Sequence, residues 1–414
     1  MNKKKNKYFF IAKPHLKHLL FLLYFLVSLG ENYIQDFLEN ENNLATPFFD
    51  VYIYILSDFL SIIPYLIVKY RTKSDIMKTP TLRSSSDLEL IYNDNGLYTT
   101  KKDLINILLL ASSDYIAQIS FVIYYLIKQE YTLDIPNINL NSIFIFNIIF
   151  LIILSKLFLH TRFYRHHYFS CLIIILVLLA LVILDIIQIN KEEGNKLLSN
   201  IYLFLRIVKT FLYSFEDVIG KVLLLYQNFT VYSLLLNKSI IQIIFSIVFS
   251  FPFIFIKLKD EENNERTLFS MIGDIFENKR NILLYFFLII MNFFYNVFLW
   301  QIIDNFSVNH LWLAQMFEGL GFLILDIITN SITLDRSLRI VLYIFLLIIA
   351  CIYNEFLVVN ICGLSKDTKL FLDYKAKKEK EDQILLENIK EDINLDETWE
   401  NKNEKSDSYI KNKD

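Results

Sequence analysis

Long apolar runs recur along the whole chain and are separated by short charged or polar segments. Each run has roughly 20 residues, the length that an α-helix needs to cross a bilayer core of about 30 Å. A soluble helix would instead carry charges at helical spacing on its outer face. The pattern predicts an all-α, polytopic membrane protein with about ten transmembrane helices. The expected spans are residues 16–36, 48–69, 104–127, 139–159, 168–189, 201–225, 231–256, 281–303, 309–328 and 338–359.

Composition and charge narrow the class of protein further. Hydrophobic residues make up 54% of the chain, and the net charge is −3, which implies no nucleic-acid partner. The abundance of Ile and Phe raises hydropathy everywhere, so the distribution of apolar residues carries the argument rather than their mean. The three cysteines have neither metal-ligand nor redox spacing and are interpreted as packing residues.

Basic residues in the short loops predict the orientation in the membrane. The lysine-rich residues 1–15 and the basic loop 70–102 fit the cytosolic side, and so does the charged, partly disordered tail 363–414. Both termini are therefore expected in the cytosol, where the tail offers a site for a partner protein. Lys257, Arg280 and other basic residues of the second half fit this rule poorly. An endomembrane (Golgi or ER) and the plasma membrane both remain open as locations.

An internal similarity relates the two halves of the chain. The second span ends with Pro64 five residues before Lys69, and the seventh ends with Pro252 five residues before Lys257. Arg165 and Arg336 likewise precede matching apolar runs. The spacing predicts two five-helix repeats, residues 16–189 and 190–362. Because five is odd, the repeats would insert in opposite orientations, an arrangement that transporters use to build a site near the midplane.

Two helix junctions carry a resemblance to a known family. Residues 154–159, LSKLFL, are followed by a polar turn that ends with two histidines, and residues 306–311, FSVNHL, occupy the corresponding place in the second half. The chain thus resembles the drug/metabolite transporter superfamily, which includes EamA-like carriers and nucleotide-sugar transporters. The resemblance implies a secondary carrier whose solute, an anionic metabolite or nucleotide sugar, binds between the repeats, with a homodimer as one assembly. The fifth and tenth spans lack the family's usual glycines, which leaves the substrate class open.

Polar residues inside the spans are the candidate substrate-binding residues, because such residues are costly in lipid. One turn apart, Asp114 and Gln118 share a face of the third span, and Asn292 and Asn296 share a face of the eighth. These two spans correspond in the repeat, so both stripes are expected to line one cavity together with Asn147. The alternative is that their hydrogen bonds only hold helices together.

Charged groups add three further candidates. Glu318, beside Gln315, is expected either to bind a proton or cationic group or to pair with a basic residue. Arg206 and Lys209 would suit a phosphate or carboxylate substrate. Internal pairing, or side chains that extend to the membrane surface, would explain these two cations equally well. Asp58 and Asp326 are weaker candidates.

No catalytic constellation is visible. P-loop, G-x-S-x-G and HExxH patterns are absent, and the histidine-containing turn 160–167 is too small for a di-iron centre, so it is interpreted as a contact with anionic lipid. We therefore expect a transporter with no cofactor and no metal, which is not an enzyme. The alternatives are a non-transporting scaffold or trafficking protein and, less favoured, a lipid-modifying enzyme embedded in the membrane.

Overall fold

The computed structural model describes most of the helical part of the chain. The described residues are 14–42, 47–78, 101–130, 144–161, 163–191, 196–227, 229–250, 257–259, 265–267, 273, 279–306, 308–329, 334–355, 357, 368, 371, 375, 378–379 and 383. The chain forms two compact units, one from Met1–Arg162 and Leu172–Ala350, the other from Phe163–Cys171 and Cys351–Asp414. Most of the predicted tail and the stretch 79–100 lie outside the described residues.

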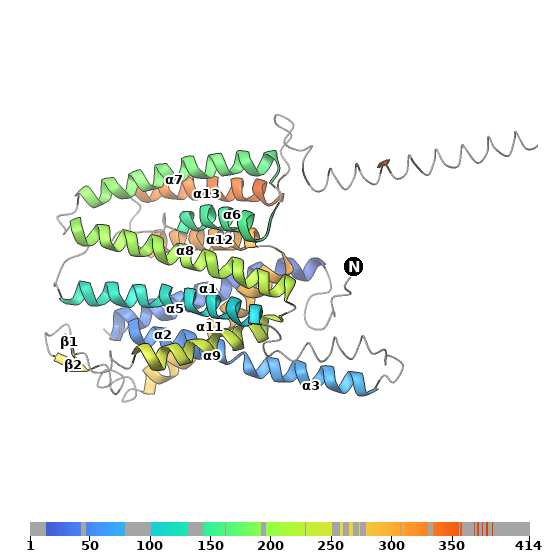
Figure 1. The fold of residues 1–414 in the computed structure, drawn as a ribbon. Helices are drawn as coiled ribbons and strands as arrows, with labels where there is room; N and C mark the ends of the chain where they lie inside the picture. Colours follow the sequence, from blue (N-terminus) through green and yellow to red (C-terminus); the bar gives the residue numbers. More distant parts are fainter. Residues whose placement is uncertain are drawn as a thin grey trace, which may run out of the picture. The chain divides into compact units, whose positions relative to one another are not determined.

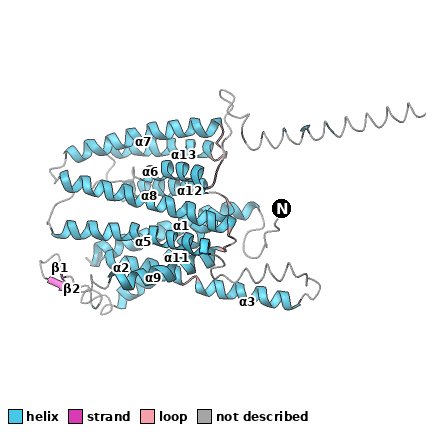
Figure 2. Ribbon diagram, in the orientation of Figure 1, coloured by secondary structure: helices cyan, strands magenta, loops and turns pink. Residues whose placement is uncertain are grey.

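Helices account for nearly all of the described structure (Figure 1 and Figure 2). They are α1 (Pro14–Asn42), α2 (Pro47–Phe59), α3 (Ile62–Lys78), α5 (Lys101–Glu130), α6 (Phe144–Phe158), α7 (Arg165–Lys191), α8 (Lys196–Tyr226), α9 (Val231–Ser250), α11 (Lys279–Asn305), α12 (Val308–Thr329) and α13 (Leu334–Tyr353). A short antiparallel hairpin pairs β1 (Lys257–Lys259) with β2 (Glu265–Thr267). The predicted all-α class is confirmed, and each expected span overlaps at least one described helix.

The second expected span is divided into two helices. Pro64 has no N–H to donate and clashes with the preceding turn of a continuing α-helix. The chain therefore turns at Leu60 and Ser61, where the Ile63 N–H bonds to the Leu60 carbonyl at 3.1 Å. Helix α3 then runs on to Lys78. The loop that was predicted to begin at residue 70 is thus helical over its first nine residues, a correction to the sequence interpretation.

The helices of the first unit pack in a crossed pattern. Helix α5 packs along α8, and α11 packs along α1. In the same way α2 contacts α11 while α9 contacts α5, and α6 contacts α8 while α12 contacts α1. Two further pairs, α2 with α9 and α6 with α12, complete the set. In the predicted repeats, α1 corresponds to α8, α2 to α9, α5 to α11 and α6 to α12. When each helix is replaced by its counterpart, these contacts are exchanged for one another.

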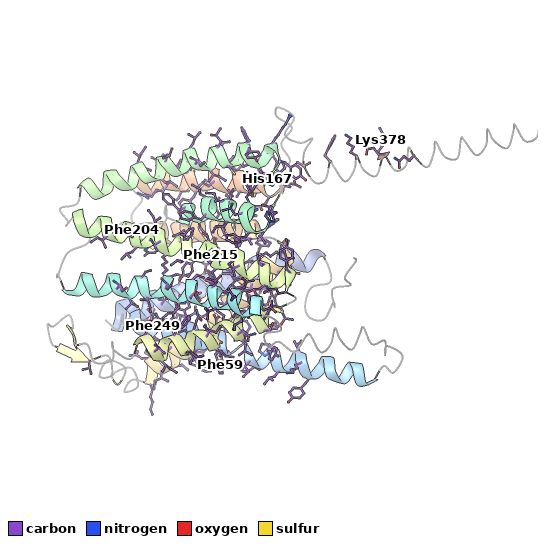
Figure 3. All side chains as sticks on the ribbon, viewed as in Figure 1. Phe59, His167, Phe204, Phe215, Phe249 and Lys378 are labelled. Atoms are coloured by element: carbon purple, nitrogen blue, oxygen red, sulfur yellow. The ribbon has the colours of Figure 1, made fainter. Side chains whose placement is uncertain are left out.

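Buried ionic side chains occur together with exposed large apolar side chains in the described part of the chain, whose core also contains many apolar residues. Ionic and amide side chains are buried, including those of Asp58, Asp114, Glu216 and Lys238. Large apolar side chains face outward, and Figure 3 labels two of the exposed ones, Phe204 on α8 and Phe249 on α9. Helices α7 and α13 also carry exposed large apolar side chains, among them Leu176 and Val341. Large exposed apolar faces normally contact lipid or another protein.

Among the described residues, three helical stretches are long and apolar enough to cross a membrane. They are Phe49–Tyr70, Val231–Phe249 and Lys279–Asn305. Shorter apolar stretches lie in α1, α6, α7 and α13. Helix α8 has 31 residues, but its ionic side chains lower its hydropathy. The finding is compatible with a membrane protein.

Helices α8 and α11 approach closely at Gly220. A Cβ atom at this position would overlap the six-membered part of the Trp300 indole ring, which is buried. One residue further along α8, the Lys221 ammonium donates to the backbone carbonyls of Ile303 and Asp304 in the last turn of α11. A cation at a helix C-terminus satisfies carbonyls that have no partner within the helix.

We expect Gly220→Ala to lower the free energy of unfolding by about 1–3 kcal/mol, because the added methyl group must push Trp300 aside. The measurement is the melting temperature of the purified protein. Gly30→Ala is the matched control, since a Cβ at Gly30 would meet only Met291 at an ordinary 3.6 Å. That control should be neutral or slightly stabilising because alanine is the better helix former. Equal melting temperatures for the two variants would contradict the close approach.

The second unit holds the histidine pair that the sequence assigned to a lipid surface. His166 is 2% exposed, and its Nε2 lies 3.3 Å from a Glu355 carboxylate oxygen. His167 packs edge-on against the Tyr353 ring. Burial, together with the neighbouring His166, lowers the pKa of His167 to about 4, so this imidazole is neutral at pH 7. The expectation of lipid contact is corrected for His166, whose side chain lies inside the protein.

Candidate functional site

A buried lysine in the middle of α9 connects three carboxylates from three other helices. The Lys238 ammonium lies 2.8 Å from Asp58 on α2, 2.8 Å from Asp114 on α5 and 3.1 Å from Glu216 on α8. All four side chains are at most 8% exposed. An ammonium group has three protons to donate, and here each proton has a carboxylate within hydrogen-bonding distance.

Three amide side chains extend this group. Gln118 Nε2 donates to Asp114 at 2.9 Å, and Gln242 Nε2 donates to the other oxygen of the same carboxylate at 2.8 Å. Asn296 on α11 donates to Asp58 at 2.7 Å. We call these seven residues the Lys238 cluster: Lys238, Asp58, Asp114, Glu216, Gln118, Gln242 and Asn296. Five helices, α2, α5, α8, α9 and α11, contribute to it.

The two cations predicted as anion ligands lie on α8 beside this cluster. Lys209 is partly buried, lies over the Tyr213 ring at 5.4 Å and interacts electrostatically with Asp114 and Asp50. Arg206 is also partly buried and acts electrostatically on both Lys209 and Tyr213. Lys209 therefore interacts electrostatically with two acidic residues and with Arg206, while its role as an anion ligand stays a prediction.

A second polar group joins α1, α2, α11 and α12. The Tyr24 hydroxyl donates to Glu318 at 3.0 Å and lies 3.0 Å from the Tyr295 hydroxyl. Tyr54 donates to Glu31 at 3.1 Å, and the two carboxylates interact electrostatically. Glu318 also accepts a hydrogen bond from Ser28. The described hydrogen-bond partners of Glu318 are thus hydroxyl groups, whereas the sequence had offered a basic residue as a possible partner.

A third group connects the central helices α6, α8 and α12. The Asn147 amide donates to Gln315 Oε1 at 2.8 Å, and its oxygen accepts from the Ser214 hydroxyl. Asn147 and Ser214 are buried. Helices α6 and α12 are counterparts in the predicted repeat, so this contact lies where the two halves would meet.

The structure brings most of the predicted residues into these three groups. Asp114, Gln118 and Asn296 belong to the Lys238 cluster, while Asn147 pairs with Gln315 and Glu318 pairs with Tyr24. Asn292 is 1% exposed and lies one turn before Asn296 on α11. Nothing is described of the side chain of Asp326. The predicted residues thus take part in three sets of hydrogen bonds, and a cavity that they line in common stays a prediction.

The sequence interpretation missed the residue at the centre. Lys238 is the only charged residue in α9, which is otherwise apolar or uncharged. A single cation in the middle of a hydrophobic span is itself a signal of function, and this signal could have found it. Tyr24, Glu31, Glu216 and Gln242 are likewise absent from the predicted site, and Asp58 was predicted only as a weaker candidate.

The arrangement provides acceptors for cationic hydrogen-bond donors in a region shielded from water. Burying one cation among three carboxylates is costly unless each charge is compensated, which makes such groups sensitive to protons, ions or ligands. Among the groups described here, nothing resembles a nucleophile held by a general base. A comparison with models of protein families and with curated proteins gives no match for this chain. The family resemblance therefore depends on the residues of the two helix junctions alone.

Proposed function

We propose that the chain is a multi-pass membrane transporter of the drug/metabolite transporter type, which moves a small solute by alternating access between two inverted five-helix repeats. The first support is the distribution of side chains. A chain with apolar outer faces and buried ionic groups is suited to lipid surroundings, where polar groups must find partners inside the protein. Each of the ten expected spans overlaps a described helix or helix pair, and three helical stretches are long and apolar enough to cross a membrane.

The crossed packing of the helices supports the two repeats. If α1, α2, α5 and α6 correspond to α8, α9, α11 and α12, each principal contact has a counterpart on exchange of the halves. Polar contacts follow the same rule. Asn296 on α11 donates to Asp58 on α2, and Gln242 on α9 donates to Asp114 on α5. A pseudo-twofold arrangement of this kind is what inverted repeats would produce.

The Lys238 cluster is the observation that carries the proposal. Asp58 and Asp114 belong to the first proposed repeat, whereas Glu216 and Lys238 belong to the second. A solute site at the interface of the repeats needs polar groups from both, because each half must release or engage the solute as it rocks. A scaffold has no comparable need for buried charges shared between its halves, and no described group favours a membrane-embedded enzyme.

We expect purified protein in liposomes to exchange at least one labelled solute from a pooled panel of nucleotide sugars, phosphorylated metabolites and amines. Asp114→Asn should reduce this exchange by about tenfold or more, since it removes a charge that the cluster holds at the interface. Lys279→Gln is the control, because Lys279 is exposed at the start of α11. Absence of exchange for every panel member, from protein shown to be folded, would contradict the transporter proposal.

The same panel tests the anion hypothesis. If Arg206 and Lys209 bind a phosphate or carboxylate substrate, neutralising both should abolish uptake of the anion and leave melting behaviour largely intact. If they only balance Asp114 and Asp50, neutralising them should instead lower stability without selecting against anions. The two results separate a substrate contact from an internal charge balance.

A further inference from the structure

Acidic groups outnumber basic groups in and around the Lys238 cluster. Among the described residues, the charged side chains that belong to it or interact with it electrostatically are two cationic groups and four carboxylates: Lys238, Lys209, Asp58, Asp114, Glu216 and Asp217. With every group ionised, the difference is two negative charges. An excess charge in an apolar interior is strongly unfavourable unless a bound proton or cation compensates it.

Hydrogen-bond acceptors are also in excess at this place. Gln242 is 1% exposed, and its Oε1 has no hydrogen-bond partner among the described residues, although its Nε2 donates to Asp114. Gln118 Oε1, on the neighbouring helix α5, is also buried and also has no hydrogen-bond partner among the described residues, although Gln118 Nε2 donates to Asp114. Turning either amide over would place its oxygen against the Asp114 carboxylate, so the orientation is fixed by that charge. Both amides thus keep an acceptor in the cluster for a donor that comes from elsewhere.

A third acceptor lies on the helix that closes the cluster. Asn292 Oδ1 on α11 is buried and has no hydrogen-bond partner within the described part of the chain. Asn292 precedes Asn296 by one helical turn, and residues with this spacing share a face. Unsatisfied buried acceptors are uncommon in folded proteins, so each one calls for an explanation, and a bound solute is one that fits beside a cluster of charged groups.

We propose that the Lys238 cluster is the solute-binding site and that its solute is a cation with N–H donors, namely a protonated primary or secondary amine. The inference rests on the transporter function proposed above and specifies its substrate class. Lys238 itself illustrates the chemistry, because its ammonium group satisfies three carboxylates by donating three protons. A solute ammonium would use the same carboxylates together with the free oxygens of Gln118 and Gln242. A quaternary ammonium carries the charge but has no N–H group to donate, and an anion has neither.

The test compares pairs of amines that differ only in their N–H donors. The melting temperature of the purified full chain is measured with methylammonium against tetramethylammonium, with ethanolamine against choline, and with inorganic phosphate. We expect at least one primary amine to stabilise the protein in a saturable manner and at an affinity about tenfold or more above that of its quaternary partner. No stabilisation by either primary amine, equal effects within both pairs, or stabilisation by phosphate alone would overturn the proposal.

Two variants tie the effect to the unpartnered amides. Gln242→Met keeps the side-chain length but removes the free oxygen, and it should weaken amine affinity by about 10- to 100-fold. Gln118→Met serves the same purpose if the first variant does not melt cooperatively. Ser155→Ala on α6 is the control, because Ser155 Oγ is also buried without a hydrogen-bond partner among the described residues but lies on a helix outside the cluster. Unchanged affinity in both methionine variants would overturn the assignment of the site.

The outcome also separates this inference from the proposed function. Amine binding without exchange in liposomes would support the site and contradict the transporter. Exchange of an anion or neutral solute, with no effect of amines on melting, would support the transporter and contradict the substrate class.

Discussion

Lys238→Met should be among the most destabilising single substitutions in the chain, lowering the free energy of unfolding by about 3–5 kcal/mol. The replacement leaves Asp58, Asp114 and Glu216 close together in the interior without the ammonium group that neutralises them. Removal of one partner from a buried ionic group costs far more than the group's net contribution, because the remaining charges stay desolvated. The loss is measured by denaturant unfolding of purified protein in detergent.

A combined variant separates charge from packing. When Asp58→Asn, Asp114→Asn and Glu216→Gln are added to Lys238→Met, most of the stability should return, since the three uncompensated carboxylates are removed together. Lys279→Met provides the baseline, because Lys279 is exposed and its replacement should change stability by no more than about 0.5 kcal/mol. If Lys238→Met behaved like Lys279→Met, the Lys238 cluster could not be a compact ionic group.

Tyr24→Ala is expected to lower stability by about 3–5 kcal/mol, which makes it the second large effect. Tyr24 is 0% exposed, its ring packs beside Tyr295 at a centroid distance of 5.0 Å, and its hydroxyl donates to Glu318. The substitution therefore opens a cavity and removes a donor from a buried carboxylate. Unfolding midpoints of the two proteins give the difference.

One further variant separates the contribution of the Tyr24 hydroxyl group from that of its ring, and a second serves as the control. Tyr24→Phe keeps the ring and removes only the hydroxyl, so it should cost about 1–3 kcal/mol, the penalty for leaving Glu318 with one donor fewer. Tyr33→Ala on the same helix should be nearly neutral, because Tyr33 is 72% exposed. A Phe variant as unstable as the Ala variant would show that the hydroxyl, not the packing, determines the stability at this position.

The helices could be predicted from the sequence because their signals are local. Each apolar run contains its own evidence of length and of helical preference, and hydrogen bonds within a helix join residues only four positions apart. The pairing of Gln118 with Asp114 was accessible for the same reason, since both lie on one face of α5. Pro64 could be recognised in the sequence as a helix-breaking residue. Whether the chain turns there or the helix only bends depends on contacts with other helices, which the sequence does not give.

The centre of the site could not be predicted because its partners are remote in the sequence. Asn296 and the Asp58 that it contacts are separated by 238 positions, and Gln242 lies 128 positions from Asp114. Which helices lie side by side decides these contacts, and the hydropathy pattern carries no such information. Lys238 has a long, flexible side chain, so even its direction was undetermined until the neighbouring helices were placed.

The close packing of the Trp300 ring against Gly220 makes its fluorescence a probe of this helix contact. The chain has only three tryptophans, and Trp300 is 1% exposed at the contact between α8 and α11. Both helices belong to the second proposed repeat, and each packs along a helix of the first, α11 along α1 and α8 along α5. Indole emission responds to the polarity of its surroundings. With the other two tryptophans replaced by phenylalanine, the fluorescence of Trp300 would report whether the contact between α8 and α11 stays closed while the repeats move, without any added label.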